Sequence, residues 1–151
     1  MAIAKITDQE KKKLREKAKK KIEQLKQILN NEDTAILLND FKNKFNICET
    51  AYKVILAKYQ QSTGKRKNNK IIFNQVCPAL RFAGYNFDEE LLKNLFGSKS
   101  EKGKTVKKLR DDVTHGIDQK AVNEISARRK ELFTYMDTFL DVIESFDDTT
   151  A

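Results

Sequence analysis

The sequence predicts an all-α fold, a single-domain helical bundle with an up-and-down core. Charged residues make up 34% of the 151 positions, with 5 glycines and 1 proline, a balance that suits helices and disfavours a sheet-rich barrel or sandwich. Apolar residues recur at helical spacings of three and four along most of the chain. The length is that of one domain with a core of its own. We therefore expect one domain over residues 1–151, with long first, second and last helices and shorter helices between them.

The first helix is expected over residues 8–29. Thr7 and Glu10 form a capping-box pattern, which marks the start of a helix. Its apolar residues lie on one narrow stripe that we expect to be buried, and lysines fill most of the remaining surface. A basic amphipathic helix can also lie on an anionic membrane, but this thin stripe without aromatic residues disfavours that alternative. The stripe consists of Leu14, Ala18, Ile22, Leu25, Ile28 and Leu29.

The second helix, over residues 33–61, has the most regular apolar pattern of the sequence. Its mean spacing of about 3.5 residues is typical of a helix that packs along its whole length, either in a bundle or at a dimer seam. We favour packing inside the bundle. The stripe consists of Leu38, Phe41, Phe45, Cys48, Tyr52, Ile55 and Tyr59.

A polar loop and a short helix follow. The loop, over residues 62–70, contains no apolar residue, and its bases either contact phosphates or belong to a solvated connector. These bases are Lys65, Arg66, Lys67 and Lys70. The helix, over residues 71–84, is expected to bend or start a second turn at Pro78 and to end at Gly84. Its expected buried face is Ile72, Val76, Leu80 and Ala83.

The last third of the chain predicts three more helices. Asp88 or Asn86 caps a helix over residues 88–96, which Gly97 closes. A polar linker over residues 98–103 leads to a helix from about residue 104, and Asp118 caps one long final helix. We expect its acidic end to fray over residues 147–151. Its expected core stripe is Val122, Ile125, Leu132, Met136, Phe139, Ile143 and Phe146.

The positive charge is concentrated in two segments. Residues 1–29 hold ten Lys and Arg against four acids, and residues 62–108 hold eleven against four, within a net charge of +8. Such asymmetry is expected of a protein that binds a polyanion, most simply nucleic acid. The alternative is that lysine-rich faces only keep the protein in solution.

Other classes of function lack their residues. Cys48 and Cys77 lie in apolar helical patterns without a zinc-ligand spacing, so we interpret them as small core residues and expect no metal and no cofactor. Motifs of P-loop enzymes, dehydrogenases, serine hydrolases and zinc proteases are missing. The sequence shows no signal peptide and no stretch that could span a membrane, so we expect a cytoplasmic protein.

The segment KKLRDDVTHGI, residues 107–117, holds the only histidine of the chain. Arg110 and His115 are five residues apart and can converge only if the helix ends between or just after them. Gly116 provides that end, because glycine is favoured just past a helix C-terminus. Two simpler interpretations remain. His115 can serve as a favourable partner for the helix dipole, and Arg110 can form a solvated ion pair with the acids after it.

The pattern of Arg110, Asp111, His115 and Gly116 before a long final helix resembles the signature of the HEPN superfamily of small helical bundles. The resemblance covers roughly residues 104–146 well and the first half only in outline. It implies a metal-independent ribonuclease that works as a dimer, with Arg and His of both subunits in one cleft. Other HEPN proteins have lost catalysis and bind nucleotides or partners. Some carry a modified Tyr two residues after the His; Ile117 stands there, so we do not expect that regulation.

RNA cleavage without a metal needs proton transfer and positive charge. His115 suits the first role and Arg110 the second, because an imidazole titrates near neutral pH and a guanidinium matches phosphate. We expect Asp111 to orient one of them, and a homodimer to bring together two of each. The expected function is an endoribonuclease acting as a toxin or in phage defence, with RNA and an antitoxin or activating protein as partners. The alternative is a non-catalytic module that binds RNA, nucleotide or a partner protein. The expected substrate-binding residues are Lys104, Lys107, Lys108, Lys65, Arg66 and Lys67.

Overall fold

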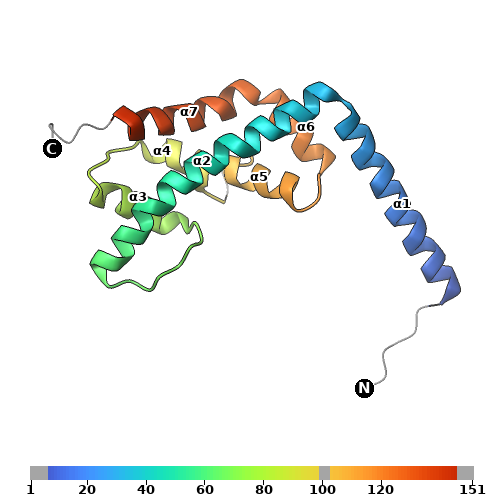
Figure 1. Ribbon diagram of the computed structural model, residues 1–151, viewed down its shortest axis with the longest axis horizontal. Coiled ribbons are helices and arrows are strands. Elements are labelled where there is room, and N and C mark those ends of the chain that lie inside the picture. Colours follow the sequence, from blue (N-terminus) through green and yellow to red (C-terminus); the bar gives the residue numbers. More distant parts are fainter. Residues whose placement is uncertain (1–6, 99–102, 146–151) are drawn as a thin grey trace, which may run out of the picture. The chain divides into compact units, whose positions relative to one another are not determined.

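The computed structural model describes residues 7–98 and 103–145, and of residues 25 and 28–30 the backbone alone. The described residues form helices without a β-strand, which confirms the predicted all-α bundle (Figure 1). The chain divides into two compact units, residues 1–36 and 37–151, which we describe separately. The helices are α1 (Asp8–Asn30), α2 (Glu32–Thr63), α3 (Phe73–Phe82), α4 (Glu89–Phe96), α5 (Val106–Thr114), α6 (Gln119–Ala127) and α7 (Arg129–Ser145).

Helix α1 belongs to the first unit and starts as predicted. The hydroxyl of Thr7 accepts a hydrogen bond from the backbone N–H of Glu10 at 3.1 Å. The prediction that its apolar stripe is buried is wrong at three positions, because Leu14 is 61% and Ile22 52% exposed, and Ala18 is exposed as well. The side chains of Leu25, Ile28 and Leu29, the rest of the predicted stripe, lie outside the described residues. Single aliphatic residues separated by lysines present too little continuous apolar area to hold a helix in a core.

Helix α2 provides most of the core of the second unit. Its predicted stripe is confirmed at Leu38, Phe41, Phe45, Cys48, Tyr52 and Tyr59, all of them buried. Near its end the buried position is Leu56, whereas Ile55 is half-buried. Such a shift of one residue is expected when a straight helix of 3.6 residues per turn carries a stripe of mean spacing 3.5. The opposite face leaves Ile47 and Val54 exposed.

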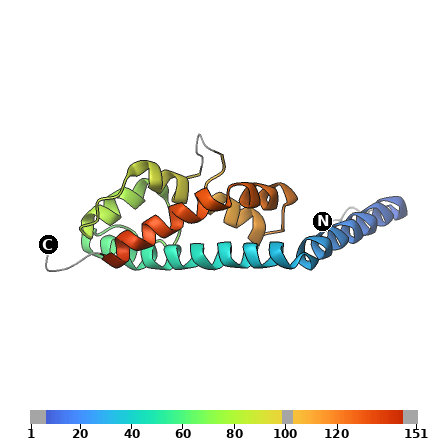
Figure 2. The same cartoon turned by 90° about the horizontal axis from the view of Figure 1, so that it is seen from above.

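Helices α3 to α7 lie on one side of α2 (Figure 2). Their packing is centred on Phe96 at the end of α4, which is 1% exposed. Its ring lies 6.0 Å from Phe45 and 5.4 Å from Tyr52 of α2, and 5.3 Å from Phe139 of α7, measured between centroids. Edge-to-face and tilted pairs at these distances are favourable beyond the burial of their area. Phe96 therefore joins α2, α4 and α7.

The short helices follow their predicted caps. Asp88 caps α4 by accepting from Glu90 N at 3.1 Å, and Gly97 follows its last residue. Helix α3 runs through Pro78, which is exposed and removes only one backbone donor. Its predicted face is corrected at two points. Ala83, the C-cap residue, is only half-buried. Ile72 is exposed, and its neighbour Ile71 is the buried residue, because both precede the helix and do not follow its period.

The prediction of one long final helix is wrong. Asp118 caps α6 as expected, but α6 ends at Ala127, and α7 begins at Arg129. Arg128 between them leaves the helical conformation, with φ −105° and ψ 17°. Its guanidinium donates to Glu124 of α6, to Glu131 of α7 and to the carbonyl of Lys104. These contacts hold the break in place.

The predicted core stripe holds across this break. Val122, Ile125, Leu132, Met136 and Phe139 are buried, and Ile143 is half-buried. Phe146, the predicted frayed end over residues 147–151 and most of the predicted 98–103 linker lie outside the described residues.

Replacing Phe96 by Ala should lower the free energy of unfolding by about 3 to 5 kcal/mol, because the change empties the centre of a packed aromatic cluster. Urea denaturation followed by circular dichroism measures this. Val54→Ala, at a site that is 69% exposed, is the control and should change the free energy by less than about 0.5 kcal/mol. Equal effects of the two substitutions would contradict the central role of Phe96.

Candidate functional site

Helix α5 is held by its N-terminus and by its apolar edge. The hydroxyl of Thr105 accepts from Lys108 N at 3.2 Å and donates to the carbonyl of Gly97 at 2.7 Å, which ties the start of α5 to the end of α4. Val106, Leu109 and Val113 are buried, as their spacing predicts. This orientation leaves Arg110 on the flank of the helix.

The side chain of Arg110 is anchored between α2 and α5. Its Nη1 and Nη2 donate to the two carboxylate oxygens of Glu49 at 3.5 and 3.2 Å, and its Nε donates to Asp111 at 3.0 Å. The guanidinium carbon lies 4.6 Å from the centre of the Phe45 ring, a cation–π geometry. These contacts use three of the five N–H groups of a guanidinium. The other two have no partner among the described residues, and 22% of the side chain is exposed.

The charge around Arg110 is nearly balanced. Glu49 and Asp111 contribute two negative charges, and Lys53 lies 3.8 Å from Glu49 as a second cation. A phosphate that approaches the free N–H groups of Arg110 therefore meets little net positive charge. The attraction of a polyanion to this region has to come from other basic groups.

His115 lies exposed at the end of α5. It is the C-cap residue, and its backbone N–H donates to the carbonyl of Asp111 at 3.1 Å. Gly116 follows with a φ of 138°, which confirms the predicted need for glycine at this position. No described side chain binds the imidazole. The helix ends where the sequence predicts, and both Arg110 and His115 remain accessible.

Lys104 and Lys108 share one carboxylate, that of Asp112. Their ammonium groups lie 2.9 and 3.1 Å from its two oxygens. Partial burial raises the pKa of the Asp112 carboxyl, but the hydrogen bonds from the two lysines outweigh this and hold the pKa below its usual value. The hydrogen bond to Asp112 likewise raises the pKa of Lys104. Of the three lysines predicted on this helix, Lys107 alone has no ion pair within the described part of the chain.

The backbone before α5 is docked on α6. The N–H of Lys104 donates to Glu124 at 3.0 Å, and its carbonyl accepts from Arg128 at 2.8 Å. Gly103 next to it has a φ of 122°, and a Cβ there would lie 2.9 Å from Nη1 of Arg128. The start of α5 is therefore fixed from two sides.

The predicted basic loop forms a separate site. Lys65, Arg66 and Lys67 line an open pocket of about 560 Å³ beside α3. Glu49, the partner of Arg110, lies near the middle of α2, whereas the loop follows its last residue, Thr63. At a rise of about 1.5 Å per residue the two positions on α2 are roughly 20 Å apart. The structure thus brings Arg110 together with Asp111, and Lys104 together with Lys108. The basic loop of Lys65, Arg66 and Lys67 lies apart from Arg110.

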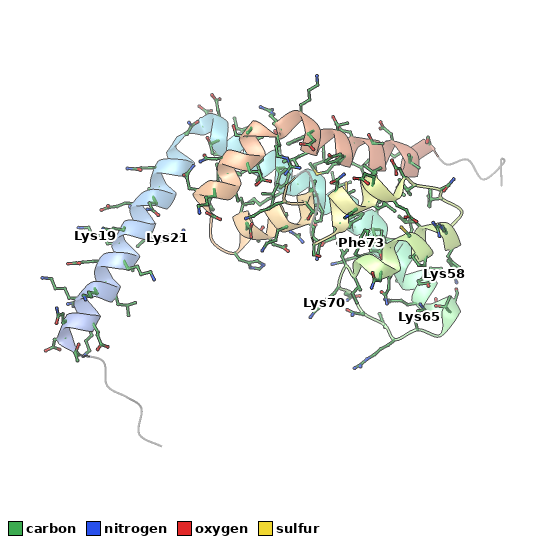
Figure 3. All side chains as sticks on the ribbon, turned by 180° about the vertical axis from the view of Figure 1, so that it is seen from behind. Lys19, Lys21, Lys58, Lys65, Lys70 and Phe73 are labelled. Carbon is green, nitrogen blue, oxygen red and sulfur yellow. The ribbon has the colours of Figure 1, made fainter. Side chains whose placement is uncertain are left out.

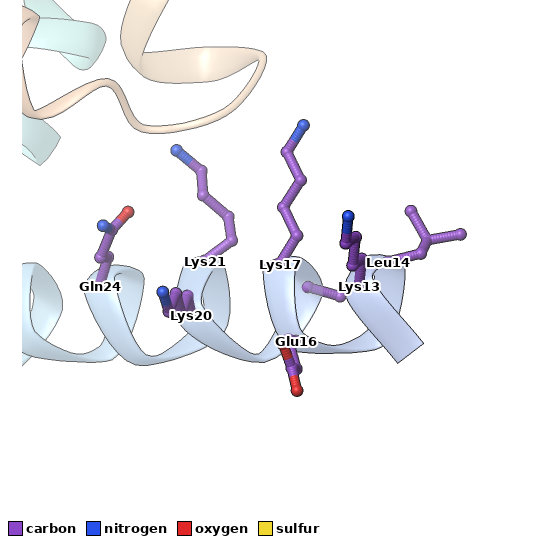
Figure 4. A pocket seen from close by; sticks show the side chains of 8 residues that line it. Lys13, Leu14, Glu16, Lys17, Lys20, Lys21 and Gln24 are labelled. Atoms are coloured by element: carbon purple, nitrogen blue, oxygen red, sulfur yellow. The ribbon is translucent and has the colours of Figure 1, made fainter. Parts of the chain in front are cut away.

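A second hollow lies along α1 in the first unit (Figure 4). Every side chain that lines it comes from this one helix, including Lys13, Lys17 and Lys21. One helix cannot enclose a ligand, so we interpret this hollow as the open space between long side chains and assign no site to it.

We assign no function to the two free cysteines. Cys48 is fully buried, and burial raises the pKa of its thiol to about 12, so it stays protonated. Cys77 is half-buried, and burial raises the pKa of its thiol as well. The described ranges, 7–98 and 103–145, contain no cluster of three or more His, Cys, Asp or Glu residues that could hold a metal ion. Within the same ranges no helix is long and apolar enough to cross a membrane.

Comparison of this chain with protein-family models, with curated proteins and with solved structures finds no match. The resemblance to HEPN proteins therefore rests on the motif residues and their helical setting.

Two residues of these sites were missed by sequence reasoning. Glu49 binds Arg110 from 61 positions away, and Gln60 holds the basic loop through Asn68. Each directly follows a buried residue of the α2 stripe, Cys48 or Tyr59. A polar residue at the edge of such a stripe is the available signal, but it does not identify the partner.

The pKa of Asp112 leads to a pH prediction. A carboxylate whose pKa is lowered on folding adds stability above its unfolded pKa of about 3.9, and this stability is lost as the pH falls through the folded pKa. Asp112→Asn should lower the free energy of unfolding by about 1 kcal/mol at pH 7 and by progressively less as the pH falls below about 3.9. Urea titrations across this range measure the difference. Asp141→Asn, at an exposed site on α7, is the control; the same pH profile in both variants would contradict the role of the Lys104–Asp112–Lys108 cluster.

Proposed function

We propose that this chain is a metal-independent endoribonuclease of the HEPN type that acts as a homodimer. The observation that carries the proposal is the arrangement on α5. Arg110 is held on the flank of this helix with two unused N–H groups, and His115 is exposed just past its last residue. A fixed guanidinium and an accessible imidazole are the two groups that phosphodiester cleavage without a metal requires.

Each residue has a distinct role in this proposal. His115 assists removal of the proton from the 2′-hydroxyl or donates a proton to the leaving 5′-oxygen. Arg110 binds the phosphate oxygens as negative charge develops on them. Asp111 and Glu49 are positioning residues, because their carboxylates restrict the rotation of the guanidinium. One imidazole cannot be acid and base in the same step, and a two-fold dimer would provide a second.

The proposed partners follow from the same chemistry. RNA is the proposed substrate, and Lys104, Lys107 and Lys108 are proposed to hold its backbone. Lys104 and Lys108 bring two positive charges against the single negative charge of Asp112, so this part of α5 keeps a positive excess. We propose action in the cytoplasm as a toxin or in phage defence, where an antitoxin or an activating protein controls cleavage.

A second candidate is a non-catalytic module that binds RNA, nucleotide or a partner protein. The observation that favours it is the near-neutral environment of Arg110. Two carboxylates and the Phe45 ring already satisfy much of its charge, as expected of an arginine that joins two helices. In that case His115 only caps α5, and the basic surfaces carry the binding.

Cleavage of RNA by the purified protein in EDTA separates the two candidates. His115→Ala should lower the rate at least about a hundredfold, because it removes the proton-transfer group. The imidazole is exposed and has no described partner, so the thermal unfolding curve should not change. Lys120→Ala, at an exposed position on α6, is the control and should cleave like the original protein. Cleavage that is absent in all proteins, or equal in all of them, would remove the catalytic assignment.

The dimer is tested by light scattering during size exclusion. We expect twice the mass of the chain, and we expect sulfate or RNA to stabilise the dimer because they bridge two Arg110 side chains. A ligand that binds only the folded form contributes about 2.7 kcal/mol at a hundredfold excess over its dissociation constant. A strict monomer in the presence of RNA would leave the binding module as the better proposal.

A further inference from the structure

The loop between α2 and α3 carries four cations and no acid, over residues 64–72. Lys65, Arg66, Lys67 and Lys70 line the open pocket of about 560 Å³ together with Asn68 and Gln75. Arg66, Lys67 and Lys70 form no ion pair with any described residue. Lys65 and Lys70 lie at the same end of the second unit as Lys58 of α2 and the start of α3 at Phe73 (Figure 3). This pocket has the unbalanced positive charge that the surroundings of Arg110 lack.

The conformation of the loop is fixed by Gln60, which is 3% exposed. Its amide donates to the carbonyl of Asn68 at 3.1 Å and accepts from the N–H of the same residue at 3.2 Å. The side chain of Asn68 in turn accepts from Lys70 N at 2.9 Å, and Gly64 turns the chain at the end of α2 with a φ of 68°. A loop that is already ordered loses less conformational entropy when a ligand binds.

An aromatic surface adjoins the cations. Phe82 at the end of α3 is 48% exposed, and its ring meets that of Tyr59 edge to face at 5.6 Å. The ammonium group of Lys65 lies 5.3 Å from the centre of the Tyr59 ring. Tyr59 thus contacts both the exposed ring of Phe82 and the ammonium group of Lys65. Exposed aromatic rings beside basic grooves are the means by which proteins bind unpaired bases and their phosphates.

We propose that this surface binds single-stranded RNA. We call it the loop site; it consists of Lys65, Arg66, Lys67, Lys70, Gln75 and Phe82. The phosphates of the strand contact Arg66, Lys67 and Lys70, and one base stacks on Phe82. Gln75 lines the same pocket, and a side-chain amide can hydrogen-bond to the polar edge of a base. A duplex offers the same phosphates, but its bases are stacked on one another and leave Phe82 without a partner. An anionic membrane provides charge but no stacking surface.

The loop site depends on the proposed function only in the choice of RNA. It lies roughly 20 Å from the position of Glu49, measured along α2 at about 1.5 Å per residue. It can therefore hold a strand whether or not Arg110 and His115 cleave it. Binding measured in the His115→Ala background is free of cleavage and tests the loop site alone.

The test uses the full-length chain and a fluorescent oligoadenylate, with binding followed by anisotropy over a range of salt concentrations. One variant replaces Arg66, Lys67 and Lys70 by Ser. Its matched control replaces Lys42, Lys120 and Lys130 by Ser, three lysines of the same unit without a described ion pair, so that the net charge changes equally. A second pair compares Phe82→Ala with Phe82→Tyr, which keeps an aromatic ring.

We expect the loop variant to bind the single strand at least about tenfold more weakly than its control. The slope of the logarithm of affinity against that of salt should fall by about 2, because each lost phosphate contact contributes roughly 0.7. Phe82→Ala should weaken binding about tenfold, and Phe82→Tyr should restore it. The duplex form should bind less tightly and should not respond to Phe82→Ala.

Equal affinities of the loop variant and its charge-matched control would overturn the loop site. A duplex bound as tightly as the single strand, or an unchanged affinity of Phe82→Ala, would overturn the stacking of a base. Binding to phosphatidylglycerol vesicles that needs the loop cations, without binding to RNA, would assign the surface to a membrane instead. Loss of RNA cleavage with intact binding would remove the proposed catalysis and leave the loop site standing.

Discussion

The position of Arg110 in the second unit depends on the burial of Phe96. Its ring is the point where α2, α4 and α7 meet. The next residue, Gly97, presents the carbonyl that accepts the hydroxyl of Thr105, and Thr105 starts α5. Helix α5 then carries Arg110 to Glu49 on α2, one turn from Phe45, whose ring packs against Phe96. The packing of one aromatic side chain and the placement of one guanidinium are thus parts of the same arrangement.

Local patterns in the sequence were sufficient for most of the fold. The stripe of α2, apart from Ile55, and the caps Thr7 and Asp118 depend on residues within one or two turns and are confirmed, and of the two candidates for the cap of α4 the structure has Asp88. The break at Arg128 was missed, although the stripe from Ile125 to Leu132 has no apolar residue between them on that face. One of the three contacts of Arg128 that stabilise the break is with the carbonyl of Lys104, which is distant in sequence. For α1, periodicity identified a helix but did not show whether enough apolar area faces a core.

In the candidate site, too, the local features could be predicted from the sequence and the contacts between distant residues could not. The spacing of Arg110, His115 and Gly116 was enough to place the end of α5, because a helix and its terminus are local structures. The sequence does not identify the partner of Arg110, because any acid on the inner edge of another helix could serve. Only the packing of α2 against α5 selects Glu49. The same holds for Gln60, whose role appears only when the loop folds back onto the end of α2.

Both backbone polar groups of Lys104 are bound by side chains of α6 and its C-cap residue. Its N–H is bound by Glu124 and its carbonyl by Arg128, while Gly103 leaves no room for a side chain. In evolutionary terms, positions 103, 124 and 128 are constrained to change together or to remain as they are. Insertions and deletions after Gly103 would rotate α5 and carry Arg110 away from Glu49. Length variation among descendants of this sequence should therefore accumulate before Gly103, in the stretch that leads from α4.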